Sequence, residues 1–112
     1  MTSALIKRDR LRLQIYEGGQ ILSIDYDLGD GDLLNADLKR SGAGWNVAVT
    51  YSIKRLTKSG RNAMRGVVAA LLATLGETVG PHHATGDSEA MFESLKRVMD
   101  TLHDYFVNEL FA

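Results

Sequence analysis

The fold is decided by residues 44–75, which read GWNVAVTYSIKRLTKSGRNAMRGVVAALLATL. The stretch begins with the strict alternation of a half-buried strand, in which small or polar residues separate the larger Trp45, Val47, Val49, Tyr51 and Ile53. After a basic turn the apolar residues adopt helical spacing, at Met64, Val67, Val68, Leu71, Leu72 and Leu75. We therefore expect a sheet that ends at the turn and a helical cover that begins there.

Three more strands are predicted before this stretch, at about residues 10–16, 20–28 and 33–39. Glycine-containing turns separate them, at residues 18–19, 29–31 and 42–44. Short turns between successive strands predict an antiparallel meander of four strands. Apolar residues alternate with polar ones, so we expect helices on one face only.

Two antiparallel helices are predicted after the turn, at about residues 59–78 and 87–110. Gly76 or Gly80 is expected to end the first helix, and Pro81 to prevent its continuation. Residues 78–86 then form an exposed loop, and Asp87 or Ser88 caps the second helix. The prediction is one α+β domain over residues 1–112, with its sheet at about residues 10–55 and both helices on its apolar face.

Composition and charge limit the classes of function. The chain has 112 residues and no cysteine, and no apolar segment follows the basic N-terminal residues, so a cytoplasmic protein is expected. The longest uncharged run, residues 66–76, is about half the length of a membrane-spanning helix, which argues against a membrane partner. Eleven of the thirteen Lys and Arg residues lie in residues 1–65, so the first half of the chain is basic and the second acidic.

The basic turn is the first candidate for a binding site. Five cationic side chains fall within twelve residues at a helix start: Lys54, Arg55, Lys58, Arg61 and Arg65. Such a place suits a phosphate group or a nucleic acid, because free backbone N–H groups and several cations converge there. The same charges also fit a solvated turn. Asp25, Asp27 and Asp37 lie on the polar face of the predicted sheet, which argues against a stacking platform for bases.

No catalytic, metal or cofactor site is predicted. The sequence has no nucleophile-elbow motif, and the absence of cysteine excludes thiol enzymes. His82 and His83 are adjacent, and adjacent side chains usually point apart. A convergence of His83, Asp87 and His103 is conceivable, but a metal site needs three or four ligands, and nothing in this spacing requires them to meet.

The leading hypothesis is a small non-catalytic protein-interaction module, such as a regulator, inhibitor or adaptor. Its motive is the unusually small residues on the back of the first helix, which suit close packing against another subunit: Ala63, Gly66, Ala70 and Ala73. We expect a homodimer with a protein partner of unknown identity. The alternative is a nucleic-acid or phosphate binder that uses the basic turn at residues 54–65.

Overall fold

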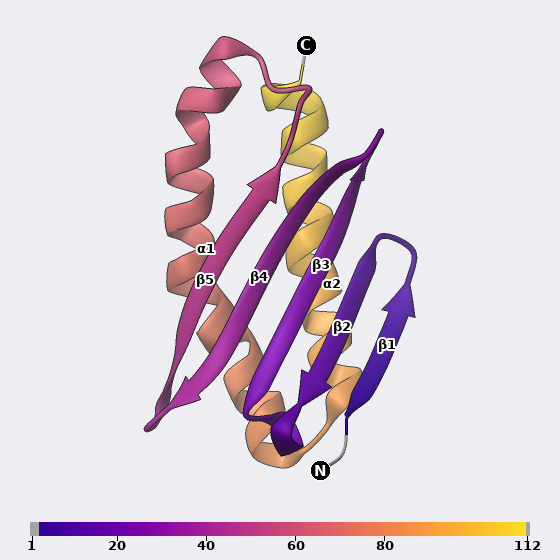
Figure 1. Cartoon of the computed structure of the whole chain (residues 1–112), viewed down its shortest axis with the longest axis vertical. Coiled ribbons are helices and arrows are strands. Elements are labelled where there is room, and N and C mark those ends of the chain that lie inside the picture. The colour runs from indigo at the N-terminus through magenta and orange to yellow at the C-terminus, as the bar shows by residue number, and fades with distance from the viewer. Residues whose placement is uncertain (1–2, 112) are drawn as a thin grey trace.

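A computed structural model describes residues 3–111, as a five-stranded antiparallel sheet with two long helices on one face (Figure 1). The strands are neighbours in chain order: β1 (Ala4–Arg8), β2 (Leu11–Tyr16), β3 (Ile21–Gly29), β4 (Asp32–Ser41) and β5 (Gly44–Ser52). The helices are α1 (Lys58–Thr85) and α2 (Ser88–Tyr105), followed by a π-helical turn, η2 (Phe106–Leu110). The α+β class and the antiparallel sheet are confirmed.

The predicted number of strands is wrong, because β1 precedes the four strands that the alternation indicated. This strand has only five residues, and Ile6 is the only one of them that is partly buried, while the other four are exposed. Its turn to β2 contains Asp9 with a φ of 55° instead of a glycine. A short strand with little burial and no glycine turn leaves a weak sequence signal.

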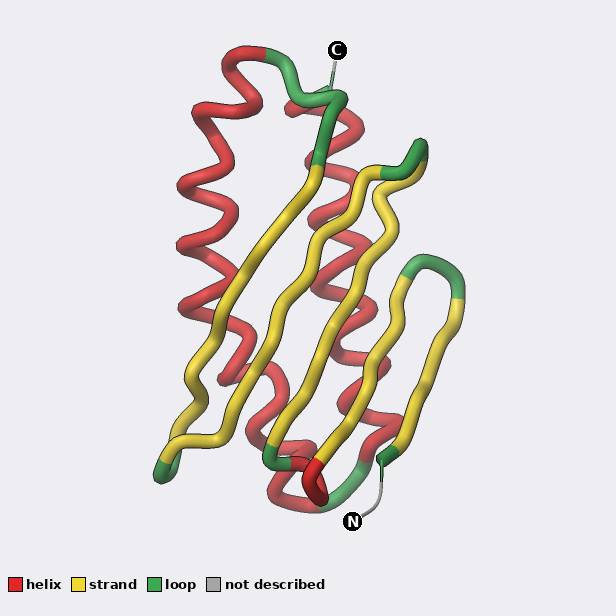
Figure 2. Tube along the Cα trace, in the orientation of Figure 1, coloured by secondary structure: helices red, strands yellow, loops and turns green. Residues whose placement is uncertain are grey.

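The core lies between the sheet and the helices (Figure 2). Register fixes which residues enter it, because apolar residues of neighbouring strands stand opposite one another: Leu13 pairs with Ile24, Ile24 with Ala36, and Ala36 with the partly buried Val49. A shift by one residue would move the whole apolar set to solvent. The helices contribute Met64, Leu71, Leu75, Val79, Phe92, Leu95 and Met99.

The first helix is longer than predicted and includes the segment expected to be an exposed loop. It begins after Thr57, whose Oγ1 accepts a hydrogen bond from the Gly60 N–H at 2.9 Å, and it ends at Gly86, with a φ of 71°. Pro81 lies inside it. An internal proline costs about 3 kcal/mol, but the last two turns are held by packing, because Val79 is fully buried and His83 lies edge-on against Trp45.

The second helix and the chain end tie the two layers together. Asp87 is the N-cap of α2, and its Oδ1 accepts a hydrogen bond from the Ala90 N–H at 3.0 Å. The Leu110 carbonyl accepts a hydrogen bond from the Thr57 N–H at 3.0 Å, so η2 closes against the start of α1. A Cβ on Gly60 would lie 2.5 Å from that carbonyl oxygen, so this contact requires glycine.

Candidate functional site

The basic turn lies at one end of the molecule, where β5 ends and α1 begins, but Arg55 is used by the fold. Its Nε lies 2.8 Å from Asp32 Oδ2, and its Nη2 donates to the Leu28 carbonyl at 2.7 Å. Its guanidinium also lies 4.2 Å from the centre of the Phe111 ring. Arg55 therefore joins the β3–β4 turn to the end of the chain.

Asp32 explains why an arginine is needed there. It is the only fully buried charged residue among residues 3–111, and its carboxylate also accepts the Lys54 backbone N–H at 2.9 Å. Burial opposes ionisation of Asp32, but the hydrogen bonds from Arg55 and Lys54 outweigh it and lower the pKa of Asp32. The sequence does not indicate the Asp32–Arg55 pair, because Asp32 follows Asp30 in a glycine-containing turn and is not distinguished from an exposed turn residue.

The other cations of the predicted site are not drawn into the fold in this way. Lys54, Lys58, Arg61 and Arg65 are exposed, and the ion pairs within residues 3–111 include none of them. Arg61 donates one hydrogen bond to the Leu56 carbonyl at 3.3 Å. Arg61 and Arg65 both line a hollow between α1 and β5, together with Val49 and Tyr51.

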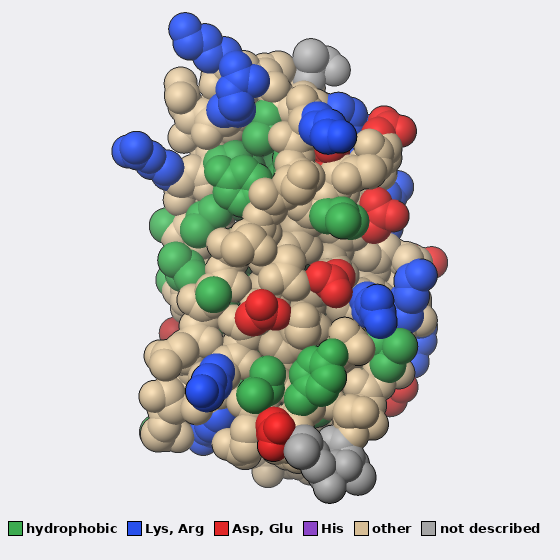
Figure 3. All heavy atoms as spheres, viewed as in Figure 1, with side chains coloured by type: hydrophobic (Ala, Val, Ile, Leu, Met, Phe, Trp, Pro, Cys, Tyr) green, Lys and Arg blue, Asp and Glu red, His purple; other side chains and the backbone are tan. Residues whose placement is uncertain are grey.

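The open face of the sheet carries the carboxylates that the alternation placed there. The space-filling view of this face shows acidic side chains near its middle and Lys and Arg toward its margins (Figure 3). Asp25 stands opposite Asn35, which donates a hydrogen bond to it at 2.8 Å, and Asp37 stands opposite Ala48. Carboxylates in the middle of this surface would repel a phosphate backbone.

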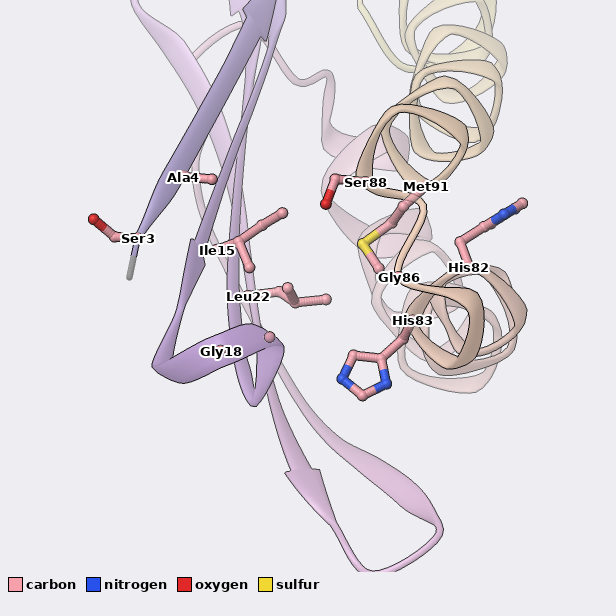
Figure 4. Close-up of a pocket in the computed structure, with 11 residues that line it drawn as sticks. Ser3, Ala4, Ile15, Gly18, Leu22, His82, His83, Gly86, Ser88 and Met91 are labelled. Carbon is pink, nitrogen blue, oxygen red and sulfur yellow. The ribbon is translucent and has the colours of Figure 1, made fainter. Parts of the chain in front are cut away.

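The three histidines do not converge. His82 bonds to Ser94 Oγ at 2.9 Å, whereas His83 points toward the sheet beside Gly18 and Gly19 (Figure 4). The ring of His103 lies 6.2 Å from that of Tyr26, under the other end of α2. Both His82 and His83 line a cavity of about 350 Å³ between the sheet and the α1–α2 connection. Within residues 3–111 no group of His, Asp and Glu side chains is arranged to hold a metal ion.

A buried tyrosine, Tyr26, lies under α2 and is hydrogen-bonded to that helix. Burial and the 2.6 Å hydrogen bond to Asp100 Oδ1 raise the pKa of Tyr26 far above its usual range, so the phenol keeps its proton. Burial opposes ionisation of Asp100, but hydrogen bonds from Lys96 and Tyr26 lower its pKa. Lys96 also pairs with Asp9 at 3.4 Å. The group links the sheet to α2 and offers no reactive nucleophile.

Ion pairs close the side of the molecule formed by β1 and α2. The Arg8 guanidinium pairs with Glu89 and with Glu93, the latter at 2.8 Å, and it lies 4.9 Å from the centre of the Phe92 ring. The hydrogen bond to Glu89 is the main cause of a raised pKa at Arg8. Side chains of α2 therefore reach across the seam to the edge strand.

The opposite side, formed by β5 and α1, has a different surface. Two hollows of about 450 and 490 Å³ lie between strand and helix, and Leu72, which is 45% exposed, lines both. The α1 surface carries no charged residue between Arg65 and Glu77. The helical spacing predicts Leu72 in the core stripe. This prediction is wrong, because the first half of α1 extends past the edge of the sheet (Figure 1).

A third hollow, without charged residues in its lining, lies on the outward side of the helix pair. This groove of about 380 Å³ is lined by Ala63, Gly66, Val67, Ala70, Leu71, Thr74, Val98, Thr101, Leu102 and Tyr105. Three of the four predicted self-association residues line it. Ala73 instead faces the seam with β5.

By length and composition alone, α1 could also cross a membrane, a test that buried core helices pass as well. In this fold its apolar stripe packs against the sheet. Comparisons with models of protein families, with curated proteins and with solved structures found no match for this chain.

Proposed function

We propose that this protein is a small non-catalytic protein-interaction module, a regulator, inhibitor or adaptor, that self-associates and holds a protein partner. The observation that carries the proposal is the uncharged groove between α1 and α2, whose lining includes the exposed Gly66, Ala70 and Tyr105. Apolar hollows of this kind are typical of interfaces, because charged residues are depleted at interface cores. The groove's small residues would let another helix approach closely.

Gly66 supports this use of the groove. It lies inside α1, where glycine is about 1 kcal/mol less favourable than alanine. A Cβ at this position would meet no atom within 4 Å, so nothing in the described chain requires glycine there. Gly60 differs, because the Leu110 carbonyl occupies the space of its Cβ. A close-packed partner helix supplies the missing reason for Gly66.

One side chain at the groove, Tyr105, is suited to fill the same groove of a second protomer. Tyr105 is 42% exposed and lies at the same groove as Ala63 and Gly66. In a two-fold dimer each surface contacts its own copy, so the tyrosine of one protomer can occupy the hollow of the other. Tyrosine is enriched at such positions because its ring buries a large area with few rotatable bonds.

Light-scattering chromatography of the full chain over a range of concentrations tests the proposal. We expect a dimer, and Ala70→Glu is expected to shift it to monomer by placing a charge in the groove. Ala48→Glu, on the open face of the sheet, is the matched control and leaves the dimer unchanged. A wild-type monomer at all concentrations, or a dimer that is indifferent to Ala70→Glu, contradicts self-association through this groove.

Nucleic-acid or phosphate binding through the basic turn stays a prediction, now without Arg55. Its test is fluorescence anisotropy with short single- and double-stranded oligonucleotides at low salt. Binding through Lys54, Lys58, Arg61 and Arg65 would weaken steeply as salt rises. Each phosphate that a Lys or Arg side chain neutralises releases a counterion from the nucleic acid, and added salt opposes that release. The absence of binding at low salt contradicts it.

A further inference from the structure

The outer edge of β5 is a free hydrogen-bonding edge. Among the described residues β5 pairs with β4 alone, so the backbone groups on its other side meet no strand. All nine residues of Gly44–Ser52 lack charge, and none is proline. Natural edge strands are normally short, charged, interrupted or covered, because an exposed flat edge pairs with other chains.

The helix beneath this edge forms a floor for an added strand. α1 crosses under β5, and its first half extends past the edge of the sheet (Figures 1 and 2). The hollow toward the start of β5 is bordered by Trp45 and Val47, and the hollow toward its end by Val49 and Tyr51. Leu72 stands between them.

The two hollows along β5 suit the alternating side chains of an extended chain. Successive side chains of a strand point to opposite faces and rise about 3.3 Å per residue, so every second side chain would point down toward α1. The two hollows then receive alternate side chains, while the backbone pairs with β5. Recognition by strand addition works in this way, with affinity from the backbone and specificity from pockets.

Charge distinguishes the two ends of the groove. Arg61 and Arg65 line the hollow beside Tyr51, and Lys58 is exposed at the start of α1 nearby. The other hollow is lined by one cation and one anion, Arg40 and Glu77. An acidic residue of the added chain is therefore favoured at the Tyr51 end.

We propose that the groove between β5 and α1 binds an extended segment of a partner protein as a sixth strand, with apolar residues at alternate positions and an acidic residue beside Arg61 and Arg65. The inference rests on the proposed function and names its partner's chemistry. A second copy fits this edge less well. If two copies paired their β5 strands along the whole length, both α1 helices would lie on the same face of the joined sheet. Because each α1 extends past its own β5 edge (Figure 1), the two helices would then occupy the same space.

The test begins with selection of random twelve-residue peptides displayed on phage against the immobilised full-length protein. Enriched sequences are expected to alternate apolar and polar residues and to carry Asp or Glu at one end. An enriched peptide, labelled with fluorescein, then serves as the probe in anisotropy titrations. A library with no enriched sequence, or with enriched sequences that lack alternation, overturns the proposal.

Variants then locate the site. Leu72→Glu is expected to weaken peptide binding by about tenfold or more, since it places a charge between the two hollows. Leu33→Glu, on the open face of the sheet and 51% exposed, is the matched control and leaves binding unchanged. Arg65→Glu should weaken binding, and a peptide with Lys in place of its acidic residue should restore it. Equal binding to wild type and to Leu72→Glu contradicts the site.

Backbone pairing has a direct test of its own. An added strand uses only every second N–H group of the peptide toward β5. Methylation of one alternate set of peptide nitrogens should abolish binding, whereas methylation of the other set should not. Equal tolerance of both sets contradicts strand addition.

The outcomes separate this inference from the proposed function. A peptide whose binding is lost with Ala70→Glu but kept with Leu72→Glu places the partner in the groove between the helices. That result overturns the β5 site and keeps the interaction module. A dimer that Leu72→Glu converts to monomer, with no peptide enriched, shows a second copy at the edge and also overturns the inference. A monomer with no enriched peptide refutes both.

Discussion

The two sides of the sheet have the same plan and opposite surfaces. Each has an edge strand and a neighbouring helix. At β1 the strand has five residues, and Arg8 and Asp9 make ion pairs with α2 across the seam. At β5 the strand has nine uncharged residues, and two hollows lie along its seam with α1, on which Trp45 packs. Within residues 3–111 both edge strands pair with one neighbour, but only the β1 side, which we call the closed side, has its seam with a helix bridged by ion pairs.

The ion pairs of the closed side matter more for specificity than for stability. Exposed salt bridges usually contribute little to the free energy of unfolding. Charged side chains at an edge nevertheless discourage another strand from pairing there. The β5 strand lacks this protection. Arg61 and Arg65 line the hollow at its Tyr51 end without an acidic neighbour among the described lining residues, whereas Arg40 at the other end is accompanied by Glu77. An acidic partner residue is therefore favoured at the Tyr51 end.

The largest expected effect on the free energy of unfolding comes from Arg55, the cation near the end of β5 that pairs with the buried Asp32. Arg55→Ala should lower the free energy of unfolding by about 3–5 kcal/mol, because it leaves the buried Asp32 carboxylate without its cation. Lys58→Ala, the matched exposed control, should stay within about 0.5 kcal/mol of wild type. Urea unfolding measures both. Similar small losses for the two variants would show that Arg55 belongs with the free cations.

The second-largest effect is expected from acid, which should lower the free energy of unfolding chiefly through Asp32 and through Asp100 on the closed side. The native pKa values of Asp32 and Asp100 are lowered from the usual value near 3.9, so protonation favours the unfolded chain. Their contribution is full above about pH 4 and is lost as the pH falls through the lower native values. Urea unfolding from pH 7 to pH 2 should show this decline, and Asp100→Asn should make it shallower. Stability that is unchanged down to pH 2 contradicts both assignments.

Replacement of Gly66 should have a smaller effect, which stabilises the fold and weakens the dimer. Gly66→Ala should raise the free energy of unfolding of the dilute protein by about 0.5–1 kcal/mol, because alanine is the better helix former. The same variant should weaken the dimer, which light scattering measures. Gly60→Ala in the same helix should destabilise the chain, since its Cβ meets the Leu110 carbonyl oxygen. A more stable variant with an unchanged dimer removes the argument from Gly66.

The smallest effect is expected at Arg8. Arg8→Ala should change the midpoint of thermal unfolding only slightly, and less at high salt than at low salt, because the pairs that it removes are exposed. Amide hydrogen exchange in β1 should become faster while exchange in β5 stays the same. Exchange in β1 that is unaffected would show that these ion pairs do not close the edge.

Much of the fold could be predicted from periodicity. The alternation around Ile24 and Val49 set four strands and their buried face correctly, because register and burial reinforce each other. β1 was missed because only Ile6 in it is partly buried. The end of α1 was placed too early because Pro81 is locally unfavourable, whereas the packing of Val79 and His83 that sustains the helix is tertiary.

The candidate site was harder to predict. The sequence drew attention to the basic turn, yet it could not separate Arg55, which Asp32 holds, from Arg61 and Arg65, which line a groove. Leu72 has the spacing of a core residue and is 45% exposed. Only the crossing of α1 under β5 gives it this position, and a crossing angle leaves no trace in a single helix pattern.

The central claim is that the β5 edge is open in the free protein and is filled by a partner strand. Residue-resolved amide hydrogen exchange of the full chain, with and without a selected peptide, tests it most directly. Alternate amides of residues 44–52 should exchange rapidly in the free protein and become protected when the peptide binds, while β1 amides stay unchanged. Amides of β5 that exchange at the same rate with the peptide bound would contradict the account.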